Sequence, residues 1–272
     1  MSKGLSLAKP KEHAKNEDSI LVKDRCVAVS DGAGGCGVFA DEWSAYLMAH
    51  LPQDRPISTF SELDGWIEGI WEHFDEEHET IAKQGDSMLL EKYYQEGAFA
   101  TLAAAWLAED DRCFWMSYGD SVVFHYSRKS RKLEHSFSAL PDFAQPPHLI
   151  NNKAPLDEVG FRAGVFELDD SSMVFAASDA LSHYIMMCYE LEHCGDYYEE
   201  LMAEQNSGTT NGQLLAVASL RPVDFDKVLS DLIDSLESEK TFEAHLVDLQ
   251  ENGILDKDDY SLVVLGNVDI KQ

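Results

Sequence analysis

The sequence predicts an α+β fold in which antiparallel sheets are covered by helices. Segments with strand composition and segments with helical periodicity occur in the order strand, two helices, a run of strands, further helices and a last strand. Strands that cluster in this way favour antiparallel pairing, whereas regular alternation with helices favours a parallel sheet. No Gly/Ser/Pro-rich linker divides the chain, so we expect one domain, residues 1–272.

Five segments are rich in the β-branched and aromatic residues that buried strands prefer. They are 25–31 (RCVAVSD), 113–120 (CFWMSYGD), 121–127 (SVVFHYS), 172–179 (SMVFAASD) and 260–268 (YSLVVLGNV). The basic stretch 127–132 (SRKSRK) is interpreted as a turn to the next short segment. On propensity alone, the Ala-rich segment 97–108 (GAFATLAAAWLA) predicts a helix.

Apolar residues with helical spacing predict helices over 39–51, 59–83 and 224–238. The residues of 59–83 that share one face are Leu63, Ile67, Ile70, Trp71 and Phe74. Thr59 and Glu62 have the spacing of a capping box at the start of this segment. His73 and His78 lack a metal-binding pattern, and we expect both on its solvated face.

The charge of the chain argues against two classes of partner. Lys and Arg total 21 and Asp and Glu total 50, which gives a net charge of −29. Nucleic acids and anionic membranes bind basic patches, so we expect neither as a partner. The five cysteines form no CxxC pair, and the polar start of the chain lacks the apolar centre of a secretory signal. These features are typical of a cytoplasmic protein.

Acidic residues stand at the ends of several predicted strands. They are Glu17, Asp18, Asp31, Asp120, Asp179, Asp258 and Asp259. Any one of them has an ordinary explanation, since acids are common in turns. If the strand ends meet in one sandwich, however, the carboxylates form a cluster that repels itself unless cations fill it. Oxygen ligands without His or Cys favour Mg²⁺ or Mn²⁺ over zinc.

The glycines that follow Asp31, in 31–37 (DGAGGCG), fit such a site. Glycine lets the backbone approach an ion closely enough for a carbonyl to bind it. The alternative is a flexible turn before the helix at 39. No Gly-Lys-Ser/Thr follows, so this is not a nucleotide-binding loop. Cys36 has no arginine in phase with it that would indicate a nucleophilic role, and we expect it to be a packing residue.

Five short motifs resemble, in order, those of the metal-dependent Ser/Thr protein phosphatases of type 2C (PPM), in particular the bacterial type. They are NEDS (16–19), VSDGAGG (29–35), YGDS (118–121), AASDA (176–180) and DDYSLVVL (258–265). The resemblance extends over nearly the whole chain. It implies a four-layer αββα sandwich of two antiparallel sheets flanked by helices. It also implies that 97–108 is partly a strand, against its propensity.

The resemblance implies a site with two Mn²⁺ or Mg²⁺ ions that activate a water for attack on phosphorus. The residues implied as metal ligands are Glu17, Asp18, Asp31, Gly32, Asp120, Asp179 and Asp258. Asp31 is implied to bridge the two ions, and Asp120 to bind a third, weaker one. Asp259 is expected to support the site. The family's phosphate-binding arginine is replaced by His13, which we expect to contact the substrate phosphate.

The function that follows is hydrolysis of phosphoserine and phosphothreonine in proteins, opposing a Ser/Thr kinase. Two alternatives stay open. The replacements at His13 and Ala180 are compatible with a phosphatase fold that binds partners without catalysis. A hydrolase of small phosphoesters would use the same acids. The irregular segments 138–160 and 194–213 are candidates for shaping substrate choice.

Overall fold

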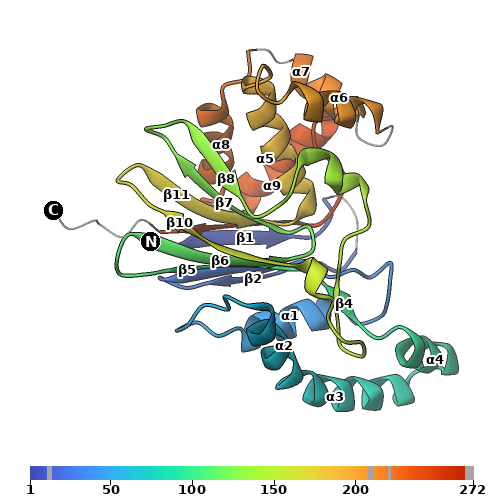
Figure 1. Ribbon diagram of the computed structural model, residues 1–272. Coiled ribbons are helices and arrows are strands. Elements are labelled where there is room, and N and C mark those ends of the chain that lie inside the picture. Colours follow the sequence, from blue (N-terminus) through green and yellow to red (C-terminus); the bar gives the residue numbers. More distant parts are fainter. Residues whose placement is uncertain (11–13, 208–210, 220–221, 267–272) are drawn as a thin grey trace.

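Two antiparallel sheets lie face to face at the centre of the molecule, between two groups of helices (Figure 1). The computed structural model describes residues 1–10, 14–207, 211–219 and 222–266. The first sheet has the strand order β1–β12–β11–β7–β8. Its strands are β1 (Lys3–Leu7), β12 (Tyr260–Leu265), β11 (Ser172–Ala177), β7 (Val122–Ser127) and β8 (Lys132–His135). Val263 of β12 pairs with Gly4 on one side and Ala176 on the other, so β12 is a central strand.

The second sheet has the strand order β10–β6–β5–β3–β2. Its strands are β10 (Phe161–Glu167), β6 (Arg112–Tyr118), β5 (Leu102–Leu107), β3 (Cys26–Ser30) and β2 (Ser19–Val22). A short ladder joins β4 (Phe99–Ala100) to β9 (Ile150–Asn151). The predicted strands 25–31, 113–120, 121–127, 172–179 and 260–268 are thus confirmed, although the last residues of 260–268 lie outside the described part of the chain.

Helices cover the outer faces of both sheets (Figure 1). Beside the second sheet lie α1 (Ala40–His50), α2 (Phe60–Glu68), α3 (Trp71–Gln84) and α4 (Ser87–Gln95). Beside the first sheet lie α5 (Asp179–Glu192), α6 (Tyr198–Asn206), α7 (Asn211–Ser219), α8 (Phe225–Ser235) and α9 (Glu239–Glu251). Two short 3₁₀ helices, η1 (Leu140–Ala144) and η2 (Glu158–Gly160), lie in the connection from β8 to β10. Within the described residues, no helix is both long enough and apolar enough to cross a bilayer.

Three apolar clusters hold the layers together. One lies between the sheets and includes Val29, Val123 and Val263. A second packs α1, α2 and α3 on the second sheet, and a third packs α5, α8 and α9 on the first sheet. Because each cluster fills one interface between neighbouring layers, the predicted four-layer αββα arrangement is confirmed.

The propensity-based prediction of a helix at 97–108 is wrong, and the strand that the resemblance implied is present as β4 and β5. Ala103, Ala104 and Ala105 are fully buried because β5 pairs with both β3 and β6 in the sandwich. Their small side chains face the two neighbouring layers alternately. Tertiary packing therefore overrides the helical preference of alanine.

Segment 59–83 forms two helices rather than one, since α2 ends before Gly69 and α3 begins at Trp71. The capping box of Thr59 and Glu62 is confirmed.

His78 is not on a solvated face: it is buried and stacks on Phe74 with ring centroids 3.7 Å apart. Cys36 is exposed, so its predicted packing role is wrong as well. Both errors concern residues whose burial depends on distant segments.

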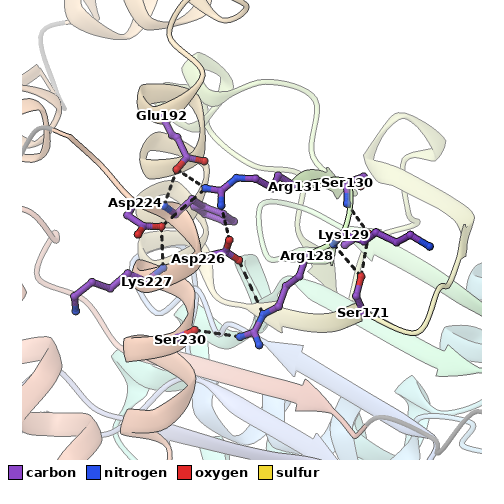
Figure 2. Close-up of polar contacts among 12 residues, drawn as sticks. Arg128, Lys129, Ser130, Arg131, Ser171, Glu192, Asp224, Asp226, Lys227 and Ser230 are labelled. Carbon is purple, nitrogen blue, oxygen red and sulfur yellow. Dashed lines mark hydrogen bonds and ion pairs between the residues drawn. The ribbon is translucent and has the colours of Figure 1, made fainter.

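The basic stretch 127–132 forms the predicted turn between β7 and β8, and acids of α5 and α8 hold it (Figure 2). The Arg131 guanidinium lies 2.7 Å from Asp226 Oδ2 and 2.8 Å from Glu192 Oε1. Arg128 donates a hydrogen bond to Ser230 Oγ at 3.1 Å. Arg131 adopts a left-handed backbone conformation with φ 56°. The ion pairs therefore hold this turn against the helical layer although the backbone conformation of Arg131 is unfavourable.

Arg131→Ala should destabilise the protein by about 1–2 kcal/mol, because Glu192 is only 16% exposed and loses its cation. For a chain of this size, that corresponds to a fall in melting temperature of about 4 °C, measured by calorimetry. Lys227→Ala is the matched control, since its i,i+4 pair with Asp231 is exposed and should contribute less than about 0.5 kcal/mol. Equal melting temperatures for the two variants would contradict this role of Arg131.

Candidate functional site

The acids that the sequence analysis singled out gather at one end of the sandwich. Asp31 follows β3, Asp120 lies between β6 and β7, Asp179 is the first residue of α5, and Asp258 precedes β12. Burial raises the pKa of Asp31 well above its ordinary value, and the charges of Asp18, Asp179, Asp120 and Asp258 raise it further. Carboxylates that affect one another in this way form one cluster.

The backbone of Asp31 is fixed by Thr101, the residue between β4 and β5. Its N–H donates to Thr101 Oγ1 at 3.2 Å, and its carbonyl accepts from the Thr101 N–H at 2.8 Å. The hydroxyls of Thr101 and Ser121 are 2.6 Å apart, and Ser121 directly follows Asp120. This short chain of contacts couples the positions of two of the acids. Thr101 was not singled out from the sequence, since a lone hydroxyl residue between two strands carries no distinctive pattern.

The glycines after Asp31 allow close contact with the segment that carries Glu17. A Cβ on Gly32 would lie 2.6 Å from the carbonyl oxygens of both Glu17 and Ala40. A Cβ on Gly34 would lie 2.0 Å from Glu17 Oε1, and the Gly34 N–H donates to Glu17 Oε2 at 3.1 Å. Gly35, in contrast, faces open space. Gly32 and Gly34 therefore let the Glu17 segment lie against the turn that follows Asp31, whereas Gly35 has no such role.

Asp18 is the most informative member of the cluster. It is only 5% exposed, and within the described residues neither carboxylate oxygen has a hydrogen-bond partner. Burial raises its pKa to about 7, although the nearby hydroxyls of Ser178 and Ser261 offset part of this increase. Leaving a buried carboxylate without partners costs several kcal/mol. A divalent cation would satisfy both oxygens, so the donor set fits the metals that the resemblance implied.

Asp120 and Asp179 show the same signs of crowding. Burial raises the pKa of Asp120 to about 6, with a further contribution from the charge of Asp258. Burial also raises the pKa of Asp179 well above its ordinary value, and the charges of Asp120 and Asp258 add to this. Negative charge at this end of the sandwich is therefore poorly compensated by the protein itself.

Comparison with solved structures identifies the fold. The catalytic domain of the serine/threonine phosphatase PstP, solved with two manganese ions, superposes with a TM-score of 0.53 at 18% identity, covering 97% of this chain and 96% of that one. For PppA of Pseudomonas aeruginosa, a regulatory component of T6SS, the TM-score is 0.52 at 15% identity, with 97% and 96% covered. For Stp1 of Staphylococcus aureus it is 0.50 at 12% identity, with 97% and 93% covered.

This chain has the fold of the bacterial serine/threonine phosphatases. No protein-family model matches it, and neither does any curated protein. The fold explains why acids from distant segments meet: in this sandwich, the ends of β3, β6 and β11 and the start of β12 lie at the same end.

A lysine that the sequence analysis missed provides part of the missing positive charge in this phosphatase fold. Lys9 Nζ lies 3.1 Å from Asp258 Oδ1. Burial lowers the pKa of Lys9, but its hydrogen bond and charge pairing with Asp258 outweigh this and raise it. Asp259 accepts hydrogen bonds from the backbone N–H groups of Lys9, at 2.8 Å, and Glu17, at 2.7 Å. Asp259 thus supports the cluster from outside, as the sequence analysis expected.

The acids form a cluster rather than a closed ligand shell. In the part of the chain that the structure describes, no three His, Cys, Asp or Glu side chains are arranged to hold one ion. Ala180 is the second residue of α5, where alanine is favourable, so the replacement at this position is compatible with the backbone. His13, expected to contact the substrate phosphate, lies outside the described residues.

The raised pKa values predict how stability depends on pH in the absence of metal. Because the folded pKa values of Asp18 and Asp120 exceed the ordinary value of about 4, the folded state binds more protons than the unfolded state from about pH 4 to about pH 7. Stability should therefore decrease as pH rises through this range. In EDTA, we expect the melting temperature to fall by about 5 °C or more between about pH 5 and pH 7.5.

Millimolar Mn²⁺ should reverse most of this fall at about pH 7.5, because the cation compensates the ionised cluster. Asp18→Asn removes one titrating group and should reduce the fall in EDTA. A melting temperature that stays constant or rises over this range would contradict the raised pKa values.

Proposed function

We propose that this protein is a metal-dependent phosphatase that hydrolyses phosphoserine and phosphothreonine in proteins. The observation that carries the proposal is the buried, unpartnered carboxylate of Asp18 within a cluster of acids. The cluster lies in a fold shared with serine/threonine phosphatases, one of which was solved with two manganese ions. A carboxylate left in this condition indicates selection for binding a cation rather than for stability alone.

The roles follow from where the acids lie. The charges of Asp18, Asp179, Asp120 and Asp258 all raise the pKa of Asp31, which suits a ligand at the centre of the acids and shared between two cations. The ligands proposed for one ion are Glu17, Asp18 and the Gly32 carbonyl, those for the other are Asp179 and Asp258, and Asp120 is proposed for a third, weaker site. Mn²⁺ and Mg²⁺ both suit this set of oxygen ligands.

When bound, the ions supply the Lewis acidity that activates a water and neutralises charge on the phosphoryl group. The protein's part is to hold the acids close together. Thr101 and Ser121 fix the turns that carry Asp31 and Asp120, and Asp259 fixes the segment that carries Glu17. Preorganised ligands avoid reorganisation during the reaction, which is how electrostatic catalysis gains most of its effect.

A phosphorylated protein produced by a Ser/Thr kinase is the substrate that we propose. The irregular segment 138–160 borders the turn of Asp120 and is therefore well placed to contact such a substrate. The net charge of −29 disfavours binding to nucleic acid and favours the concentration of divalent cations near the surface.

The first test is release of phosphate from p-nitrophenyl phosphate and from phosphoserine peptides, with Mn²⁺, with Mg²⁺ and with EDTA. We expect activity only with metal. Asp31→Asn should lower kcat by about 10³-fold or more, because it removes charge at the position shared by both ions. Asp170→Asn, an exposed aspartate in the turn between β10 and β11, should leave kcat within about twofold. Equal activity of the Asp31 and Asp170 variants would exclude the proposed mechanism.

The glycine contacts give a second test that does not depend on catalysis. Gly34→Ala places a Cβ against the Glu17 carboxylate and should weaken Mn²⁺ binding by about tenfold, measured by titration calorimetry. Gly35→Ala has open space and should bind Mn²⁺ as the wild type does. If both variants bind equally, Glu17 has no part in holding the ion.

A second candidate function is a phosphatase fold that binds partners without catalysis. It is favoured by one observation, the lack of a closed ligand group among the described residues. The same calorimetry separates the two functions. Tight Mn²⁺ binding supports the enzyme, whereas no detectable binding by the folded wild-type protein supports the binding module.

A further inference from the structure

A pocket of about 190 Å³ opens beside the turn that carries Asp120. The segment 138–148 and the start of β10 form its other walls. Asp120, Phe137, Ser138, Asp142, His148 and Arg162 are among the residues that line it. The pocket lies next to Asp120, an acid proposed for the metal cluster. A substrate held at the cluster can therefore reach into this pocket.

Two glycines allow segment 138–148 to lie against the Asp120 turn. Gly119 has φ +96°, and a Cβ there would lie 2.8 Å from the carbonyl oxygen of His148. A Cβ on Gly160 would lie 2.7 Å from the Cβ of His148. The backbone on both sides of the pocket is thus closely packed, so the walls are held in place by the fold.

Arg162 provides a cationic group whose charge the protein leaves uncompensated. Its guanidinium donates to the Gly119 carbonyl at 3.4 Å and to Ser138 Oγ at 3.1 Å, and it lies 5.4 Å from the centroid of the Phe137 ring. All three partners are uncharged. Within the described residues, Arg162 forms no ion pair, whereas Arg112 and Arg131 both pair with acids. In a chain with 50 acids, such an arginine is available to an anionic ligand.

Three other ionisable groups also line the pocket, namely His148, Asp142 and Asp120. His148 Nδ1 lies 3.9 Å from Asp157 Oδ2, and this imidazole is 46% exposed. Asp142 and Asp120 also line the pocket, Asp120 on the side of the metal cluster. Phe137, Pro146 and Pro147 supply apolar surface between these groups. An occupant with an apolar stem and an anionic end fits this arrangement, with its end at Arg162.

We propose that this pocket is a specificity subsite that binds the carboxylate side chain of an Asp or Glu next to the phosphorylated residue of the substrate, through Arg162. The inference rests on the proposed phosphatase function and names its substrate class. The phosphoryl group itself belongs at the carboxylate cluster, whereas Arg162 bonds to the Gly119 carbonyl and to Ser138 and, among the described residues, forms no ion pair with an acid of the cluster. The guanidinium therefore contacts a neighbouring residue of the substrate.

The test uses phosphoserine peptides that differ at one position, which carries Glu, Ala or Lys. The position is placed in turn one or two residues before and after the phosphoserine. We expect kcat/KM with Mn²⁺ to favour Glu over Ala by about tenfold at one of these positions, mainly through KM. Arg162→Ala should abolish this preference, and Arg162→Lys should retain part of it, because lysine keeps the charge without the planar fork.

Arg25→Ala is the matched control. Arg25 also donates to a backbone carbonyl, that of Leu107 at 3.0 Å, but it precedes β3 and thus lies at the opposite end of the strand from Asp31. Its variant should keep the full preference for Glu. The subsite is overturned if the wild type does not discriminate between Glu and Ala, if it prefers Lys, or if Arg162→Ala keeps the preference.

Failure of the proposed function is distinguishable from failure of the subsite. If no peptide is hydrolysed, the phosphatase proposal fails, and the same labelled phosphopeptides are then tested for binding by fluorescence anisotropy in EDTA. Tighter binding of the Glu peptide by the wild type, lost in Arg162→Ala and kept in Arg25→Ala, supports the subsite independently of catalysis. Equal binding of the Glu and Ala peptides overturns it.

Discussion

Repulsion among the carboxylates at one end of the sandwich is the constraint around which the rest of the structure is arranged. The acids raise one another's pKa values, and Asp18 has no partner for either oxygen within the described residues. The protein keeps them together by fixing the backbone rather than by neutralising the charge: Thr101, Asp259 and the glycines at 32 and 34 determine where the acid-bearing segments run. Packing in the three apolar clusters between the layers offsets the destabilisation that this repulsion causes.

Two cations near the proposed ligands have partners of different chemistry. Lys9 pairs with the Asp258 carboxylate, whereas Arg162 bonds to the carbonyl of Gly119, the residue before Asp120, and to Ser138. The charge of Lys9 is therefore already used within the protein. Arg162 has no carboxylate partner among the described residues, so it can contribute to orienting an anionic group as well as to affinity.

Much of the fold could be predicted from the sequence, because five strands have unmistakable composition and four of the acids stand directly at their ends. Two features could not be predicted from local pattern. The helix α5 is buried on nearly all sides, so it lacks the amphipathic period that reveals a helix at a surface. The strand β5 consists largely of alanine, whose local preference is helical. In the site, Lys9, Thr101 and Arg162 act through contacts with segments far away in the sequence, and no spacing along the chain encodes such contacts.

Residues from the beginning and from the end of the chain meet at the cluster, and this has a consequence for folding. Glu17 and Asp259 are joined by a hydrogen bond although they stand 242 positions apart, and β1 pairs with β12 over a similar separation. Contacts of this kind form late, since closing so long a loop is entropically costly until the intervening layers have packed. No partially folded intermediate that lacks the β1–β12 pairing can assemble the complete cluster. The proposed metal affinity would thus be a property of the finished fold, and during refolding its appearance would report the last step rather than the first.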